Sequence, residues 1–204
     1  IPVEMQEKYL NIILFETERL NKLTQSLIDL NQFGHHGIHL DLSDFDINQI
    51  IRTTILTFEG TCQKKGISFD LVLTGQTLLV HGDMSKIQQV LYNLIDNAIK
   101  YSKESMEINI TAEESERYTI LKVRDNGLGI SEADQRIIFQ KYERAAAAKR
   151  SRRNGASGFG LGLNFVDQII KAHDGRIFVN STEGEFTEFT IYFPLENPNN
   201  IHNR

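Results

Sequence analysis

The sequence lacks the features that define several large classes of protein. It has a single cysteine, Cys62, so no internal disulfide can form and a reducing compartment is expected. It contains no apolar run of about 18 residues and no signal-type start, which argues against a membrane span or a secretion signal within it. Its formal net charge is −5, so we expect no nucleic acid partner bound through its phosphates.

The composition that is present indicates an ordinary folded protein. Hydrophobic residues make up 40% of the chain and charged residues 24%, which suits a globular domain with a buried core. At 204 residues the chain has room for one such domain and an appendage. We expect a helix and linker over residues 1–37, a main domain over 38–196 and a tail over 197–204.

The first segment has the pattern of one long amphipathic helix over residues 3–33. Its apolar residues recur in steps of three, four or seven, and they are Tyr9, Ile13, Leu20, Leu23, Leu27 and Leu30. Such a helix is not expected to be stable alone, so the apolar seam predicts a partner helix from another chain or from outside this sequence. The alternative is a helix that docks on the rest of this chain.

The main domain alternates between helical and strand patterns, which predicts an α+β fold. The expected helices cover residues 47–65, 84–101, 131–134 and 161–173, and the expected strands cover 39–42, 68–73, 78–81, 107–112, 119–124, 176–180 and 189–193. Ser43, Asp44 or Asp46 is available to cap the first helix, and Asp83 to cap the second. We expect a two-layer α/β sandwich in which helices cover one face of a mixed sheet.

Two amide side chains share one face of the helix that follows Asp83. Asn93 and Asn97 are four residues apart, so they point the same way. Mg²⁺ prefers oxygen ligands and is usually held by a few protein oxygens together with nucleotide phosphates, which an asparagine carbonyl can support. The pair therefore indicates a magnesium nucleotide site, and the alternative is a pair of solvated amides.

Asp125 ends an apolar strand and is followed by Asn126-Gly127-Leu128-Gly129. A carboxylate held at such a strand end can accept the amino group of adenine, and the glycines let a base approach the backbone closely. The alternative is an Asp-Asn-Gly hairpin turn. A helical pattern after Gly129 makes the simple hairpin the weaker interpretation.

Gly158, Gly160 and Gly162 lead into an apolar helix. A glycine-rich entry exposes amide N–H groups and the positive end of the helix dipole, which suits a triphosphate. The chain lacks the Gly-Lys-Ser/Thr phosphate loop, and these glycines do not follow a strand as in a dinucleotide-binding turn. The preceding stretch is rich in cations that either close over phosphates or are simply solvated; they are Lys141, Arg144, Lys149, Arg150, Arg152 and Arg153.

The order and spacing of these segments resemble the catalytic ATP-binding domain of sensor histidine kinases, in the superfamily that also holds gyrase, Hsp90 and MutL. The resemblance covers about residues 40–194. In its terms, Asn93 to Tyr101 is similar to the asparagine box and Asp125 to Gly129 to the first glycine box. Residues 139–142 resemble the phenylalanine box, and residues 158–162 the second glycine box. The fold implied is a Bergerat-type ATP-binding fold.

The resemblance implies ATP and Mg²⁺ as cofactors and gives roles to single residues. Asn97 binds Mg²⁺, Asn93 supports the phosphates and Lys100 approaches them, and these three form the implied catalytic set. Tyr101 packs near adenine, and Asp125 recognises its amino group. The nucleotide-binding residues implied are Asn93, Asn97, Lys100, Tyr101, Asp125, Gly127, Gly129, Ile130, Phe139, Tyr142, Arg144, Gly158, Gly160, Leu161, Gly162 and Leu163.

The first helix resembles the second helix of a dimerisation and phosphoacceptor hairpin. No histidine in the sequence has the His-Glu/Asp-Leu-Arg-Thr-Pro context of a phosphoacceptor, so these 204 residues alone are not expected to autophosphorylate. The partners implied are a response regulator receiver domain and a second copy in the parent protein. The resemblance places this region on the cytoplasmic side of a membrane-anchored sensor.

The competing hypothesis is an ATP-hydrolysing member of the superfamily. Those enzymes usually have glutamate where this chain has Asn93, and an amide cannot take a proton from water at neutral pH. Transfer of the γ-phosphoryl group to a protein side chain is therefore favoured over hydrolysis. A third possibility is a degenerate module that binds nucleotide only for regulation.

Overall fold

The computed structural model describes residues 38–75, 77–103, 106–140 and 161–195, together with Gln6, Tyr9, Leu10, Ile13 and Thr17. The chain divides into two compact units, Ile1–Ile38 and His39–Arg204. In the first unit the five described residues before Ile38 are helical, and the Thr17 hydroxyl donates to the carbonyl of Ile13 at 2.7 Å. The rest of the predicted N-terminal helix lies outside the described residues, so its packing partner stays a prediction.

The second unit is built on a five-stranded sheet in the order β2-β4-β5-β7-β6. The strands are β2 (Ser68–Leu73), β4 (Glu107–Glu114), β5 (Tyr118–Asp125), β6 (Arg176–Thr182) and β7 (Phe186–Pro194). β2 pairs with β4 in parallel, and the other pairs are antiparallel. The sheet is therefore mixed, as the sequence predicts.

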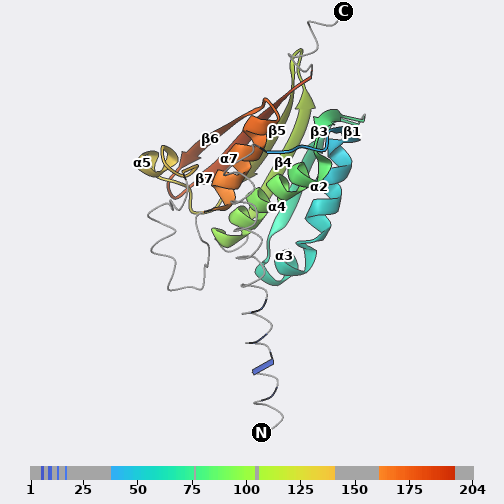
Figure 1. Cartoon of the computed structure of the whole chain (residues 1–204). Helices are drawn as coiled ribbons and strands as arrows, with labels where there is room; N and C mark the ends of the chain where they lie inside the picture. Colours follow the sequence, from blue (N-terminus) through green and yellow to red (C-terminus); the bar gives the residue numbers. More distant parts are fainter. Residues whose placement is uncertain are drawn as a thin grey trace, which may run out of the picture. The chain divides into compact units, whose positions relative to one another are not determined.

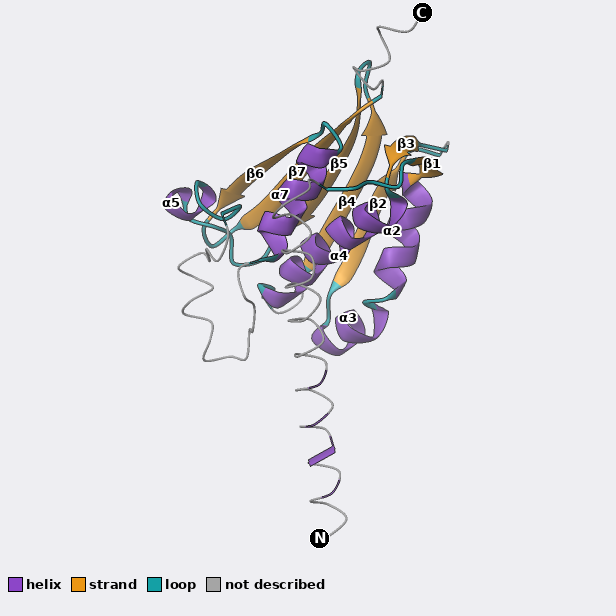
Figure 2. Cartoon of the chain, viewed as in Figure 1, coloured by secondary structure: helices purple, strands orange, loops and turns teal. Residues whose placement is uncertain are grey.

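Three helices lie side by side across one face of this sheet, as Figures 1 and 2 show. They are α2 (Ile47–Leu56), α4 (Met84–Lys100) and α7 (Gly162–Ala172). The described part of the unit also contains shorter elements, namely α3 (Glu59–Lys65), α5 (Glu132–Gln135) and a two-stranded ribbon of β1 (Ser43–Asp46) and β3 (Leu79–Gly82). This two-layer α+β arrangement confirms the predicted fold class. Among the described residues, no helix has both the length and the apolar character to cross a membrane.

Helix α4 forms the centre of the helical layer and shows why the local sequence is helical. The Asp83 side chain accepts the N–H of Lys86 at 3.1 Å, which caps the first turn. The buried face of the helix consists of Ile87, Val90, Leu91, Leu94, Ile95, Ala98 and Ile99, at helical spacing. Burying a valine, leucine or isoleucine side chain contributes about 1.5–3 kcal/mol, so packing of this face fixes the helix, and Asn93 and Asn97 lie outside the buried set.

Two predicted elements differ from the structure. Residues 39–42 are not a strand; the strand is β1, whose Phe45 pairs with Val80 so that both side chains are buried. The predicted helix over 47–65 is interrupted at Thr57–Phe58, where the N–H groups bond three residues back, to Thr54 and Ile55. That tighter turn ends α2, and a second helix then begins at Glu59.

The other elements agree with the prediction to within a few residues. Asp46 is the cap of α2, since its carboxylate accepts the N–H of Asn48 at 3.1 Å. Strand β7 begins at Phe186 rather than at residue 189. Its extension is supported by Arg124 of β5, whose guanidinium lies 3.9 Å from the Phe186 ring and pairs with Glu188. Cross-strand contacts of this kind are not visible in a local pattern.

Candidate nucleotide site

The first part of the site is a buried carboxylate at the end of β5. Asp125 is only 7% exposed, and its Oδ1 accepts the N–H of Gly127 at 2.9 Å. Burial raises the pKa of this carboxyl to about 6, against the opposing effects of that hydrogen bond and of Arg124 and Lys103. Within the described part of the chain no hydrogen bond reaches its Oδ2. The second oxygen is therefore available to an incoming donor.

Gly127 lies where no side chain fits. A Cβ at this position would come within 2.6 Å of the Tyr101 carbonyl oxygen and 2.7 Å of Asp125 Oδ1. The Tyr101 carbonyl also accepts the N–H of Leu128 at 3.1 Å. The end of α4 and the loop after β5 are thus in backbone contact, with the Asp125 carboxylate beside them.

The next turn of the loop contacts the end of β6. Gly129 has a φ of +66°, and a Cβ there would lie 2.0 Å from the carbonyl oxygen of Thr182. The N–H of Ile130 donates to the Ser181 hydroxyl at 2.8 Å, and the Leu128 carbonyl accepts from Gly184 at 2.7 Å. The sequence identified both glycines, and the structure gives the reason for each: close approach at Gly127, and close approach with a left-handed backbone at Gly129.

The second part of the site is the amide face of α4. Asn93 and Asn97 are both half-buried on this helix, as predicted. Lys100, one turn further on, forms an ion pair with Asp96. A Cβ on Gly162 would lie 3.3 Å from Asn93 Oδ1, so the first residue of α7 lies against the first of the two amides.

Among the described residues, no side chain caps the beginning of α7. Its N-cap residue, Leu161, is buried and makes no side-chain capping hydrogen bond. The Asn164 amide donates to the carbonyl of Phe139 at 2.8 Å, which ties the first turn of α7 to the segment after α5. The N–H groups at the start of α7 therefore remain a potential anion site next to Asn93.

Most of the residues predicted for the site lie in the described part of the chain, and their joint role in one nucleotide site stays a prediction. Asn93, Asn97, Lys100, Tyr101, Asp125, Gly127, Gly129, Ile130, Phe139, Leu161, Gly162 and Leu163 lie in the described ranges. Tyr142, Arg144, Gly158 and Gly160 lie outside them, as does the predicted loop over residues 143–159. Three residues that support the site had no signal in the sequence, because their partners are distant in it; they are Gln135, Asn164 and Ser181.

The donor set fits a magnesium nucleotide better than a metal held by protein alone. Across the described ranges, no three His, Cys, Asp or Glu residues form a group that could hold a metal ion. Two asparagine side chains on one face of α4, the first of them beside the start of α7, instead suit a hard cation that takes its remaining ligands from phosphate and water. The cradle around Gly127, with the buried Asp125 carboxylate, fits a flat base that carries an amino group.

Comparison with known proteins shows the family to which the chain belongs. Residues 82–197, more than half of the chain, match the model of the histidine kinase-, DNA gyrase B- and HSP90-like ATPases, and the chain belongs to this family. A curated relative, the sensor protein kinase WalK of Staphylococcus aureus, is 31% identical over 195 residues. The match covers 95% of this chain and 46% of that protein, so the chain spans less than half the length of this relative.

Solved structures of histidine kinases share the fold. The Acinetobacter baumannii histidine kinase AdeS is 28% identical with a TM-score of 0.75, covering 97% of this chain and 87% of that one. The catalytic domain of histidine kinase ThkA is 29% identical with a TM-score of 0.66, covering 76% and 97%. ThkA has also been solved in complex with the response regulator protein TrrA, at 27% identity and a TM-score of 0.74 over 96% of this chain and 53% of that one.

Proposed function

We propose that the chain is the ATP-binding catalytic region of a sensor histidine kinase. In this role it positions Mg-ATP so that the γ-phosphoryl group is transferred to a histidine outside these 204 residues. The observation that carries the proposal is the contact between Gly162 at the start of α7 and Asn93 on α4. This contact supports the proposal because the start of α7 then lies beside Asn93, one helical turn before Asn97, and phosphate oxygens and a cation are proposed to meet there.

On the base side, Asp125 is the residue proposed to select adenine. Its buried carboxylate accepts the exocyclic amino group through Oδ2, while Oδ1 is occupied by the N–H of Gly127. Gly127 and Gly129 let the loop pack against the carbonyls of Tyr101 and Thr182, which fixes the backbone proposed to lie against the base. The Tyr101 side chain is proposed to pack near the base. A carboxylate with a single protein hydrogen bond in a dry site gains more from a donor than a solvated one does.

On the phosphate side, Asn97 is the proposed protein ligand of Mg²⁺, Asn93 supports the phosphates and Lys100 adds a positive charge. Bound Mg²⁺ would neutralise charge on the transferring phosphoryl group. The chain's own contribution is position: α4 is fixed by its buried face, and Phe139 is tied to α7 through Asn164. Tyr142, Arg144, Gly158 and Gly160 are proposed to complete the nucleotide contacts.

Transfer is favoured over hydrolysis by the chemistry of Asn93. A neutral amide does not accept a proton from an attacking water, whereas a histidine imidazole brings its own nucleophilic nitrogen. The site then needs to supply only orientation and charge neutralisation.

The proposed partners follow from the relatives. ThkA was solved in complex with a response regulator protein, and we propose that a receiver domain takes the phosphoryl group onward from the histidine. We also propose a homodimer through the N-terminal helix, in a membrane-anchored parent protein with this region on the cytoplasmic side. These proposals concern a longer protein than the present chain.

The test is nucleotide binding by calorimetry and thermal melting, with ATP or ADP and with or without Mg²⁺. Ligand at a hundredfold excess over Kd adds about 2.7 kcal/mol, and at roughly 2–4 °C per kcal/mol the shift in melting temperature is easily seen. Asn97→Ala should abolish the Mg²⁺-dependent part of ATP binding. The matched control is Asn109→Ala, which removes an exposed amide bonded to Asp70; equal binding by wild type and Asn97→Ala would overturn the assignment.

A further inference from the structure

The loop proposed to lie beneath adenine is held through its own backbone on two sides. On one side, the N–H groups of Gly127 and Leu128 donate to Asp125 and to the Tyr101 carbonyl. On the other side, Leu128 bonds to Gly184 in the turn between β6 and β7, and Ile130 bonds to Ser181 at the end of β6 and to Gln135 on α5. The first set belongs to the site already described. The second set uses side chains, Ser181 and Gln135, that are not among the proposed nucleotide contacts.

Ser181 is the centre of the second set. Its hydroxyl oxygen accepts the N–H of Ile130 at 2.8 Å, and its hydrogen is donated to the carbonyl of Phe186 at 2.6 Å. The side chain is half-buried in β6, opposite Thr187 of β7. A single hydroxyl therefore joins the loop to both strands of the β6–β7 hairpin.

Gln135 adds a second connection from α5. Its Nε2 donates to the carbonyl of Ile130 and to the carbonyl of Ser181, both at 2.8 Å. The amide thus uses both of its hydrogens and forms a second link between Ile130 and Ser181, beside the hydrogen bond from the Ile130 N–H to the Ser181 hydroxyl. Both polar groups of the Ile130 backbone are occupied in this way.

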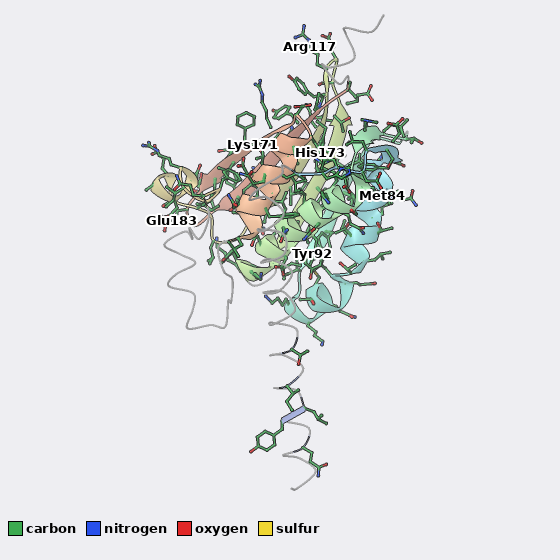
Figure 3. The ribbon with its side chains drawn as sticks, in the orientation of Figure 1. Met84, Tyr92, Arg117, Lys171, His173 and Glu183 are labelled. Carbon is green, nitrogen blue, oxygen red and sulfur yellow. The ribbon has the colours of Figure 1, made fainter. Side chains whose placement is uncertain are left out.

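The turn of the hairpin contacts the loop as well. Gly184 donates its N–H to the Leu128 carbonyl at 2.7 Å, and its own carbonyl accepts from the Lys103 side chain. Glu183, beside it, is labelled in Figure 3 at the end of the sheet where α5 lies, whereas Arg117 marks the opposite end. The connections therefore gather at the end of the sheet that carries Asp125.

We infer that Ser181 and Gln135 are positioning residues for nucleotide binding. They fix the position of the loop backbone at Gly129–Ile130, and this position determines how deeply adenine can be bound. The inference rests on the proposed function. Neither side chain is placed against the nucleotide. Both act through the loop backbone, whose displacement would widen the pocket on the side opposite Asp125.

The decisive variant is Gln135→Glu. The carboxylate has nearly the same shape as the amide but presents acceptors to the two carbonyl oxygens, so both hydrogen bonds are lost and the loop is repelled. We expect ADP to bind roughly ten- to hundredfold more weakly. The matched control is Arg136→Gln on the same turn, which breaks an exposed pair with Glu132 and leaves the loop untouched; its ADP affinity should equal that of wild type.

A second pair of variants distinguishes loss of this contact from a general loss of folding. Ser181→Ala removes the acceptor for the Ile130 N–H and should weaken ADP binding roughly fivefold, and Ser181→Thr, which restores a hydroxyl, should recover most of that loss. Calorimetry is run below the melting transition of every variant. The ratio of ADP affinities with and without Mg²⁺ should stay at the wild-type value, because the phosphate side is unchanged.

The outcomes are distinct. Wild-type ADP affinity in folded Gln135→Glu, an equal loss in Arg136→Gln, or no recovery in Ser181→Thr would overturn the inference and leave the nucleotide site intact. A changed Mg²⁺ ratio would also overturn it, since the effect would then reach the phosphate side. If wild type itself binds no ADP, the proposed function fails and the positioning role fails with it.

Discussion

The backbone carbonyl of Tyr101 accepts the N–H of Leu128 at 3.1 Å. Tyr101 is also the C-cap residue of α4, and its own N–H donates to the carbonyl of Asn97 at 3.0 Å. One residue therefore links the proposed magnesium ligand to the loop proposed beneath adenine. Because both bonds are between backbone groups, the distance between the two halves of the site depends on the main chain rather than on mobile side chains.

Replacing Asp125 with asparagine should stabilise the free protein while removing nucleotide binding. The pKa of Asp125 in the folded protein, about 6, lies above the ordinary value of 3.8. The free energy of unfolding therefore falls as the pH rises through 6 and the buried carboxyl ionises. At pH 7.5 we expect Asp125→Asn to gain on the order of 1–3 kcal/mol. The gain should disappear near pH 4, and urea unfolding at both pH values measures it.

The same variant should bind ADP at least roughly hundredfold more weakly, since an amide oxygen is a weaker acceptor than a buried carboxylate. Asp70→Asn, on a surface carboxylate bonded to Asn109, is the matched control. Stronger or unchanged ADP binding by Asp125→Asn would exclude a role for the charge in recognising the base.

Two glycines with the same φ angle should lose different amounts of stability when each is replaced with alanine. Gly129 and Gly66 both have a φ of +66°, but a Cβ on Gly129 would meet the Thr182 carbonyl at 2.0 Å, whereas Gly66 has nothing within 4 Å. Gly66→Ala should cost about 1 kcal/mol for the left-handed backbone alone. Gly129→Ala should cost at least roughly 3 kcal/mol, and similar losses in urea unfolding would contradict the contact.

His173 should make stability fall as the solution is acidified below pH 6.5. Its Nε2 accepts the N–H of Asp83 at 2.9 Å while its Nδ1 donates to the Ile169 carbonyl at 2.7 Å, so the ring must be neutral. Burial lowers its pKa, opposed by the hydrogen bond to Ile169 and the charge of Asp83. A lowered folded pKa gives stability that is present above 6.5 and is lost as pH falls through the folded value.

The measurement is the free energy of unfolding from pH 5 to 8 for wild type and His173→Phe. The variant should lose about 1–3 kcal/mol at pH 7.5 through the unpartnered Asp83 N–H, and the difference from wild type should shrink in acid. A constant difference between wild type and His173→Phe at all pH values would exclude this titration.

Lys100 should matter for phosphate affinity and little for folding. Its ion pair with Asp96 joins residues one helical turn apart and is partly exposed, so Lys100→Met should change the free energy of unfolding by less than about 1 kcal/mol. ATP binding in Mg²⁺ should weaken roughly tenfold. Lys171→Met, which removes a similar pair with Asp167 on α7, tests whether any loss of a helical cation has the same effect.

The local features of the site could be predicted because they depend on neighbours in the sequence. The Asp83 cap, the helical spacing of Asn93 and Asn97 and the strand that ends at Asp125 each follow from a few adjacent residues. The strand at 39–42 was wrong for the opposite reason, because the pairing of Phe45 with Val80 depends on a partner that is distant in the sequence. The uninterrupted helix at 47–65 was wrong although the turn at Thr57–Phe58 is local, because apolar periodicity does not distinguish a tighter turn from a continuing helix.

The sequence by itself determined the class of fold, the helix with its two amides and the glycines of the site, because periodicity, capping and backbone freedom are encoded locally. Only the tertiary structure decided what surrounds them. The packing of the sheet brings Ser181 to Ile130 and Thr182 to Gly129, and the packing of α4 beside α7 brings His173 to Asp83; these pairs are separated by about fifty to ninety residues. Such contacts form only when the sheet and its helical layer pack together, and the same packing excludes water from Asp125 and so sets its charge.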